Sequence, residues 1–181
     1  MSFPSLLLLR HGIAEERSED REDADRALTP AGRRRTREVL DRAVLLGLGV
    51  ERLIASPLLR ARQTAELAVA AGLAPSLELA SALAPGGDPM PLLAPWLDAA
   101  MLPAASEARL SLALVGHEPD LGDLVAALLG APPGSVPLRK AGIAQLQWRA
   151  AAEPGPQESS PAWAEGRWQL RLLLAPRILL G

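Results

Sequence analysis

The chain contains only two histidines, and each follows a short run of apolar residues. His11 comes after four leucines and Arg10, and His117 comes after the apolar residues 112–116. Runs of this kind are typical of strands that are buried on both faces. We therefore expect each histidine to leave the carboxyl end of a strand, where open α/β sheets bind their ligands. Two imidazoles at that edge, with a guanidinium beside them, predict a site for an anionic group.

A third segment is expected at the same edge. Ser56 and Pro57 follow a predicted strand and begin a predicted helix, with Arg60 in its first turn. Backbone N–H groups at a helix N-terminus and the planar fork of an arginine both bind phosphoryl oxygens. A neutral histidine facing such a group can attack phosphorus and form a phosphohistidine that water then hydrolyses. Two histidines without a clear carboxylate partner make a poor zinc site, so we expect no metal and no cofactor.

The elements that must position these residues alternate between strands and helices. Strands are predicted at residues 5–9, 51–55, 77–81, 111–115, 142–149 and 167–174, and helices at residues 30–46, 57–71, 89–101 and 119–130. Thr29 and Asp88 are predicted to cap two of these helices. The order predicts an α/β fold, a three-layer α/β/α sandwich with a mainly parallel central sheet and an antiparallel edge.

Composition limits the classes of protein and partner. The chain has 181 residues, of which 49% are hydrophobic, and we expect residues 1–181 to form a single domain. A net charge of −2 gives no case for nucleic acid or an acidic membrane surface as partner. The absence of cysteine excludes disulfides and thiol chemistry. The leucine run is too short for a signal peptide or a membrane span, so we expect a cytoplasmic protein. The sequence does not determine its oligomeric state.

Three polar segments have no assigned chemistry at this point. Residues 15–26 are mostly acidic and predict a solvated loop, and the sequence leaves open whether this loop folds over the pocket. Residues 150–166 predict a long, mobile hairpin connection, and the sequence does not determine whether this connection contacts a partner. A cluster of four arginines within residues 33–37 is interpreted as a solvated helix face, from which one arginine could reach a substrate.

Residues 9–12, 28–32, 56–65 and 115–117 resemble, in this order, the motifs of the histidine phosphatase superfamily, whose fold is phosphoglycerate-mutase-like. The short chain looks most like the SixA-type phosphohistidine phosphatase branch. The resemblance implies that His11 is the nucleophile and becomes phosphorylated. It also implies that Arg10, Arg60 and His117 hold the phosphoryl oxygens. Gly12 and Gly116 would allow the backbone to approach the phosphoryl group closely. Ser56 is interpreted as a helix cap rather than as a catalytic residue.

The general acid of the superfamily has no clear counterpart here. Many relatives place a Glu or Asp near the position of residues 83–88, where this chain offers only Asp88, and Glu118 is a second candidate. An alkoxide leaving group needs protonation, whereas the imidazole of a phosphoramidate leaves more readily. The sequence therefore favours a phosphatase acting on protein phosphohistidine. The alternatives are a phosphatase of a small phosphorylated metabolite and a non-catalytic phosphate-binding module.

Overall fold

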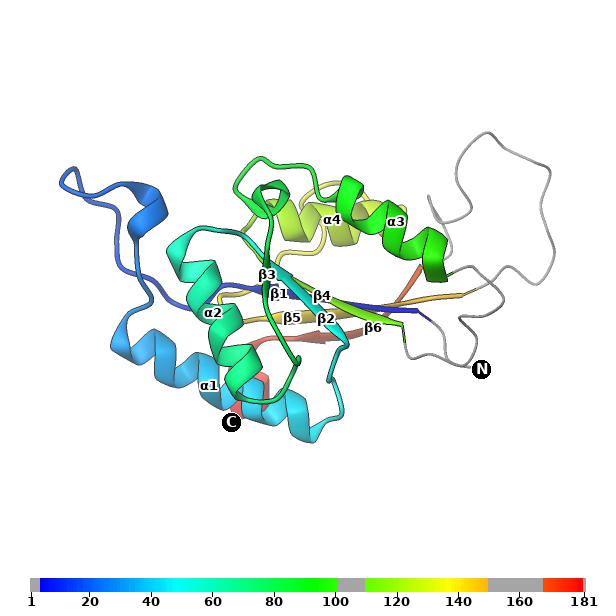
Figure 1. Ribbon diagram of the computed structural model, residues 1–181, viewed down its shortest axis with the longest axis horizontal. Coiled ribbons are helices and arrows are strands. Elements are labelled where there is room, and N and C mark those ends of the chain that lie inside the picture. The colour runs from blue at the N-terminus through cyan, green and yellow to red at the C-terminus, as the bar shows by residue number, and fades with distance from the viewer. Residues whose placement is uncertain (1–3, 101–109, 150–167, 181) are drawn as a thin grey trace.

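The structure, a computed structural model, describes residues 4–100, 110–149 and 168–180 (Figure 1). Its strands form one six-stranded sheet in the order β3-β2-β4-β1-β5-β6. β3, β2, β4 and β1 pair in parallel, and β5 runs antiparallel to both β1 and β6. The strands are β1 (Ser5–Arg10), β2 (Arg52–Ala55), β3 (Glu78–Leu79), β4 (Ser111–Gly116), β5 (Ile143–Trp148) and β6 (Trp168–Leu174).

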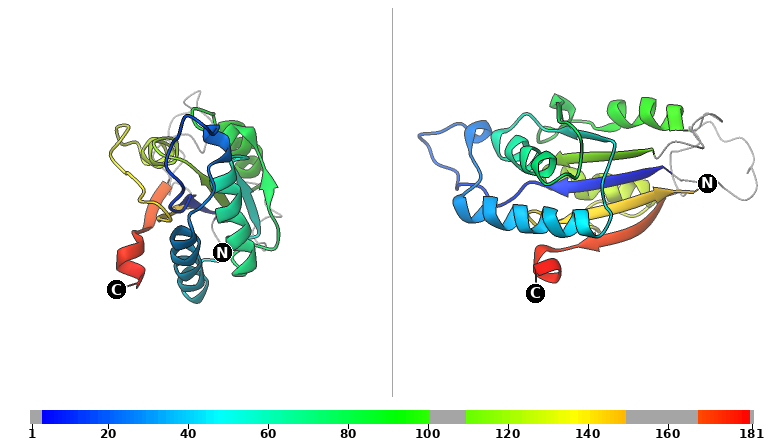
Figure 2. Two further views of the ribbon diagram at one scale, coloured as in Figure 1. Left: turned by 90° about the vertical axis from the view of Figure 1, so that its left-hand side faces the viewer. Right: turned by 60° about the horizontal axis from the view of Figure 1, so that its bottom comes forward.

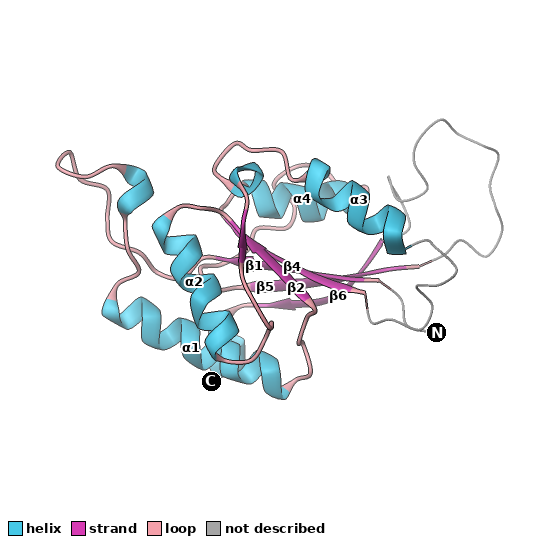
Figure 3. Cartoon of the chain, in the orientation of Figure 1, coloured by secondary structure: helices cyan, strands magenta, loops and turns pink. Residues whose placement is uncertain are grey.

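Helices cover both faces of this sheet. α1 and α2 lie on one face and α3 and α4 on the other, which confirms the predicted three-layer α/β/α sandwich (Figures 1 and 2). Strands and helices alternate along the chain as expected, up to the final pair of strands (Figure 3). The helices are α1 (Pro30–Leu45), α2 (Leu59–Ala70), α3 (Met90–Ala100), α4 (Asp120–Leu128) and α5 (Pro176–Leu180), with 3-10 turns η1 (Asp23–Asp25) and η2 (Ser81–Leu83).

The leucines of β1 fill both layers of the core. Leu7 and Leu9 belong to the core cluster under α1 and α2, whereas Leu6 and Leu8 belong to the cluster under α3 and α4. All four side chains are at most 1% exposed, as the continuous apolar run predicts. Burial of each leucine contributes about 1.5–3 kcal/mol. This burial fixes β1 at the centre of the sheet, and with it the place where His11 leaves the strand.

The structure confirms two of the three predicted helix caps and contradicts the third. The Thr29 hydroxyl accepts a hydrogen bond from the Gly32 N–H at 2.9 Å, and the Asp88 carboxylate accepts one from the Met90 N–H at 2.9 Å, so both caps are confirmed. The prediction that Ser56 caps the second helix is wrong. That helix begins two residues later than expected, and Leu58 occupies its N-cap position.

Several shorter segments differ from expectation or lie outside the described residues. The 3-10 turn η1 falls within the predicted loop of residues 15–26, and α5 and η2 were not expected. The predicted connection over residues 150–166 lies outside the described residues, as do residues 101 and 167 at the ends of two predicted elements. No helix in the described part of the chain is both long and apolar enough to cross a membrane.

Candidate active site

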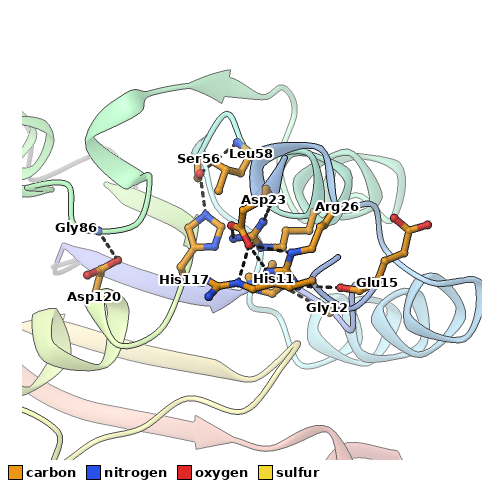
Figure 4. Close-up of polar contacts among 12 residues, drawn as sticks. His11, Gly12, Glu15, Asp23, Arg26, Ser56, Leu58, Gly86, His117 and Asp120 are labelled. Carbon is orange, nitrogen blue, oxygen red and sulfur yellow. Dashed lines mark hydrogen bonds and ion pairs between the residues drawn. The ribbon is translucent and has the colours of Figure 1, made fainter. Parts of the chain in front are cut away.

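The sheet brings the two histidines together. β1 and β4 are parallel neighbours in which Arg10 lies opposite Gly116, so His11 and His117 leave the sheet at the same level. The His11 N–H donates to the Gly116 carbonyl at 3.0 Å. The two imidazole rings lie 5.1 Å apart between centroids, tilted by 55° (Figure 4). The expected edge of the sheet therefore carries both imidazoles.

His11 has a defined tautomer. Its Nδ1 lies 2.7 Å from the carbonyl oxygen of Gly12, and because that oxygen can only accept, Nδ1 must carry the proton. Nε2 then holds a lone pair. The His11 side chain is buried, and burial is the main cause that lowers its pKa to about 3, with the nearby charges of His117, Arg60 and Arg10 acting in the same direction. The neutral ring is a nucleophile with one available nitrogen.

His117 contacts Ser56, the residue that follows β2. Its Nε2 lies 2.8 Å from the hydroxyl oxygen of Ser56, which is fully buried. Within the described residues, the buried Nδ1 of His117 has no hydrogen-bond partner. Burial, followed by the charge of Arg60, lowers the pKa of His117 to about 4. The hydroxyl that we interpreted as a helix cap accepts a hydrogen bond from the Leu58 N–H at 3.3 Å and also binds the second imidazole.

Both terminal nitrogens of Arg60 are bound by one acidic residue of the loop between β1 and α1. Nη1 donates to the main-chain oxygen of Asp23 at 2.6 Å, and Nη2 donates to the Asp23 carboxylate at 2.9 Å. Arg17 and Arg26 also donate to this carboxylate, each at 2.9 Å. The acidic loop therefore reaches Arg60 through Asp23. Nothing in its local sequence distinguishes Asp23 from the other acidic residues around it.

Opposing effects act on the Asp23 carboxylate. Burial tends to raise its pKa, but the hydrogen bonds from Arg17 and Arg60 and the arginine charges outweigh burial and hold the pKa below its usual value. Arg60 itself is only 3% exposed, and burial lowers its pKa although Asp23 opposes that shift. A guanidinium remains charged after such a shift. The pair is therefore a charged contact at the mouth of the site.

The side chains of Arg10 and Glu118 both bind the main chain of Leu138. Arg10 Nη1 donates to the Leu138 carbonyl at 2.8 Å, and the Leu138 N–H donates to the Glu118 carboxylate at 3.1 Å. Burial raises the pKa of Glu118, against the hydrogen bond from Leu138 and the charge of Arg10. The Glu118 carboxylate thus has a structural partner. Asp88, the other candidate acid, lies in an exposed contact and caps α3.

The two glycines differ in what lies beside them. A Cβ at Gly12 would come within 2.2 Å of the Thr36 hydroxyl, so only glycine fits between β1 and α1 there. The Gly12 N–H donates to the Thr64 hydroxyl at 3.1 Å. A Cβ at Gly116 would approach Leu121 to 3.4 Å. Both glycines therefore allow close packing within the protein, and their approach to a phosphoryl group stays a prediction.

We expect both imidazoles to stay neutral at pH values well below 6.5, the ordinary pKa of histidine. Because unfolded chains protonate histidine near pH 6.5, the unfolded state binds more protons below that pH. The stability contribution is therefore complete above about pH 6.5 and declines as the pH falls towards about 4. Carbon-13 NMR of the two rings should show no titration between about pH 8 and about pH 5.5. A midpoint near 6.5 for His11 would contradict this expectation.

The chemistry available at this edge of the sheet is set by its donors. In the described residues, no three His, Cys, Asp or Glu side chains gather in a way that could hold a metal ion. The groups that do gather are two neutral imidazoles, the guanidiniums of Arg10 and Arg60, and the Ser56 hydroxyl. Such a set binds a polyanion with several oxygens and offers one nitrogen nucleophile to it.

Comparisons with known proteins identify a matching family and a similar sequence. The family model of the histidine phosphatase superfamily (branch 1) matches residues 6–83. An uncharacterized protein of Picosynechococcus sp. is 46% identical over 147 residues, which cover 81% of this chain and 86% of that protein.

The solved structures that are similar over most of the chain include the following two. The protein histidine phosphatase SixA in complex with tungstate has a TM-score of 0.70 at 28% identity, covering 97% of this chain and 99% of that one. The mycobacterial glucosyl-3-phosphoglycerate phosphatase in complex with VO3 has a TM-score of 0.66 at 20% identity, covering 93% and 98%. These likenesses confirm the phosphoglycerate-mutase-like fold class.

Proposed function

This chain belongs to the histidine phosphatase superfamily, branch 1, and we propose that it hydrolyses protein phosphohistidine through a covalent phosphohistidine on His11. The family and its structural neighbours support phosphatase activity. The observation that carries the mechanism is the hydrogen bond from His11 Nδ1 to Gly12, which leaves Nε2 with its lone pair. A module that only binds phosphate needs the arginines but has no need of such a nitrogen.

The proposed reaction has two displacement steps at phosphorus. In the first, Nε2 of His11 attacks phosphorus while the bond to the leaving nitrogen breaks, and the leaving imidazole takes that bond's electron pair. In the second, a water oxygen attacks phosphorus, the bond to Nε2 breaks, and His11 recovers its lone pair. The proton of the water leaves with phosphate or passes to solvent. Arg10, Arg60 and His117 stabilise the charge on the equatorial oxygens in both steps.

Substrate binding brings a second anion to Arg60, whose buried Nε has no hydrogen-bond partner among the described residues. Its two terminal nitrogens both contact Asp23. A phosphoryl oxygen reaches these nitrogens when Asp23 shares or releases them. The exchange replaces one anion by another, so the buried guanidinium keeps a counter-charge throughout.

The contacts of the two candidate acids support a phosphoramidate as substrate. Asp88 is a helix cap in an exposed contact, and Glu118 is bound to the Leu138 main chain. When the second nitrogen of the leaving ring is protonated, the ring departs as neutral imidazole, so no acid has to protonate the leaving atom. The likeness to a protein histidine phosphatase at 28% identity agrees with this substrate class.

A phosphatase of a small metabolite is the second candidate. The observation that favours it is the burial of the nucleophile, because His11 is only 7% exposed. Such a site suits a small substrate. The fold is shared with a glucosyl-3-phosphoglycerate phosphatase, which fits either substrate class.

Competition between substrates tests the proposal. We expect the kcat/KM for a phosphohistidine peptide to exceed that for sugar phosphates and nucleotide monophosphates by a factor on the order of 10² or more, because only the ester oxygen needs an acid. An aryl phosphate, with its good leaving group, should fall between them. Higher kcat/KM values for a sugar phosphate than for the phosphoramidate would reject the proposed substrate and favour the second candidate.

Replacing Asp88 with asparagine should affect stability more than catalysis. The amide keeps a side-chain oxygen for the Met90 N–H, so we expect a loss of at most about 1 kcal/mol in the free energy of unfolding. The kcat on a phosphohistidine peptide should stay within about threefold of wild type. Urea unfolding and steady-state kinetics measure the two effects. A thousandfold loss of kcat would instead identify Asp88 as the missing acid.

A further inference from the structure

A second group of residues emerges at the same edge of the sheet as His11. Because β6 is antiparallel to β5 and β5 is antiparallel to β1, β6 points the same way as β1, and α5 begins at the same edge of the sheet, with β5 between β6 and β1. The turn of residues 139–141 lies against the catalytic segment. Its Ala141 N–H donates to the main-chain oxygens of Arg10 and His11, at 3.1 Å each.

Two adjoining clefts lie between α1, this turn and α5. They have volumes of about 290 Å³ and about 390 Å³ and share Ile13, Arg35 and Arg177. Ile13 is two residues from the nucleophile, and Lys140 precedes Ala141, which contacts the His11 main chain, so the clefts lie near the catalytic segment, although no catalytic side chain lines them. We call the two together the basic cleft. Its cationic lining consists of Arg34, Arg35, Arg139, Lys140 and Arg177, with apolar surface from Ile13, Ala31, Ala175, Pro176 and Leu180.

The basic cleft carries far more positive than negative charge. Its five cationic residues are exposed, and within the described part of the chain none of them forms an ion pair. The only carboxylate in the lining is Glu38. In contrast, the arginines of the loop of residues 15–26 are all paired with acidic residues. Clustered cations without internal partners favour an anionic ligand.

We propose that the basic cleft binds acidic side chains of the phosphoprotein substrate, in the segment that flanks the phosphohistidine. This inference rests on the proposed function and adds a docking site to it. Arginine forks bind carboxylates in a bidentate manner, and the apolar residues between them suit a peptide with both acidic and apolar side chains. A single small anion would leave most of this two-part cleft unfilled. The arginine cluster of α1, interpreted from the sequence as a solvated face, thereby gains a role through Arg34 and Arg35.

A double substitution with a matched control tests the docking site. In Arg35→Gln/Arg177→Gln, we expect the KM for a phosphohistidine peptide with acidic flanks to rise about tenfold, with kcat unchanged, because two exposed charge contacts are lost. The control, Arg37→Gln/Arg171→Gln, removes the same charge from α1 and β6, at residues outside the cleft lining. Its KM should stay at the wild-type value. Neither double variant should change the turnover of p-nitrophenyl phosphate.

A binding measurement separates this inference from the proposed function. Fluorescence anisotropy of a labelled, unphosphorylated acidic peptide needs no catalysis, and its Kd should weaken about tenfold in Arg35→Gln/Arg177→Gln alone. Peptide binding that depends on these arginines, in a protein that does not hydrolyse phosphohistidine, would support the cleft and reject the proposed function. Equal effects in both double variants, or equal KM values for acidic and neutral flanks, would overturn the docking site. Dependence on Arg35 and Arg177 for a bisphosphorylated metabolite but not for the peptide would also overturn it.

Discussion

Replacing His11 with asparagine should lower kcat by a factor on the order of 10⁴ or more, because the substitution removes the proposed nucleophile, the Nε2 lone pair that the Gly12 contact leaves free. Asparagine retains an N–H that can reach the Gly12 carbonyl, which His11 Nδ1 contacts at 2.7 Å, so the local fold should persist. Stopped assays with a radiolabelled phosphohistidine peptide, quenched in alkali, report both turnover and the covalent adduct. Wild-type protein should carry an acid-labile phosphate, and the variant should carry none.

The composition of the chain makes the adduct easy to assign. With two histidines in 181 residues, the variant retains only His117. The His117 ring is 2% exposed, its Nε2 is bound to Ser56 and its Nδ1 is buried, so it should not accept the phosphoryl group. Tungstate binding should persist in the variant, which would show that the anion site is intact. Phosphate found on His117, or turnover within tenfold of wild type, would refute the assignment of His11 as nucleophile.

The positions of the two histidines were accessible from the sequence for a simple physical reason. A continuous apolar run such as residues 6–9 can be satisfied only by a strand covered on both faces, and parallel strands deliver the residues after them to one edge of the sheet. The distance between the two imidazole rings could not be predicted from these apolar runs alone. It depends on β1 and β4 being neighbours in register, with Arg10 opposite Gly116, although about a hundred residues separate them along the chain.

Ser56 and Asp23 show why the rest of the site could not be predicted. Ser56 followed by proline has the local pattern of a helix start, but its hydroxyl is oriented towards His117 because Ala55 pairs with Val115 on the adjacent strand. Asp23 lies among several similar carboxylates, and only the fold of the loop brings it to Arg60. Tertiary pairing decided both cases, and local propensity carries no information on such pairing.

Replacing Arg60 with glutamine should reduce kcat/KM for an aryl phosphate by a factor of about 10² to 10³, the usual cost of removing one preorganised donor to a transition-state oxyanion. Arg60 is 3% exposed, so the lost charge is not replaced by solvent. The Kd for tungstate should weaken in parallel, because the same nitrogens would hold its oxygens. Arg62→Gln is the matched control. Arg62 lies on the same helix in an exposed pair with Glu66 at 3.0 Å, and its loss should change kcat/KM by less than about twofold.

The Asp23 contact provides the test of what Arg60 does. If Arg60 served only to hold the loop of residues 15–26, Asp23→Asn would reproduce the defect of Arg60→Gln. If Arg60 binds the phosphoryl group, Asp23→Asn should cost less than about tenfold in kcat/KM, since Nη1 keeps its contact with the Asp23 main-chain oxygen and the guanidinium stays in place. Removal of the competing carboxylate should also tighten tungstate binding. Equal losses in the two variants would assign Arg60 to the loop alone and leave Arg10 as the only guanidinium at the phosphoryl group.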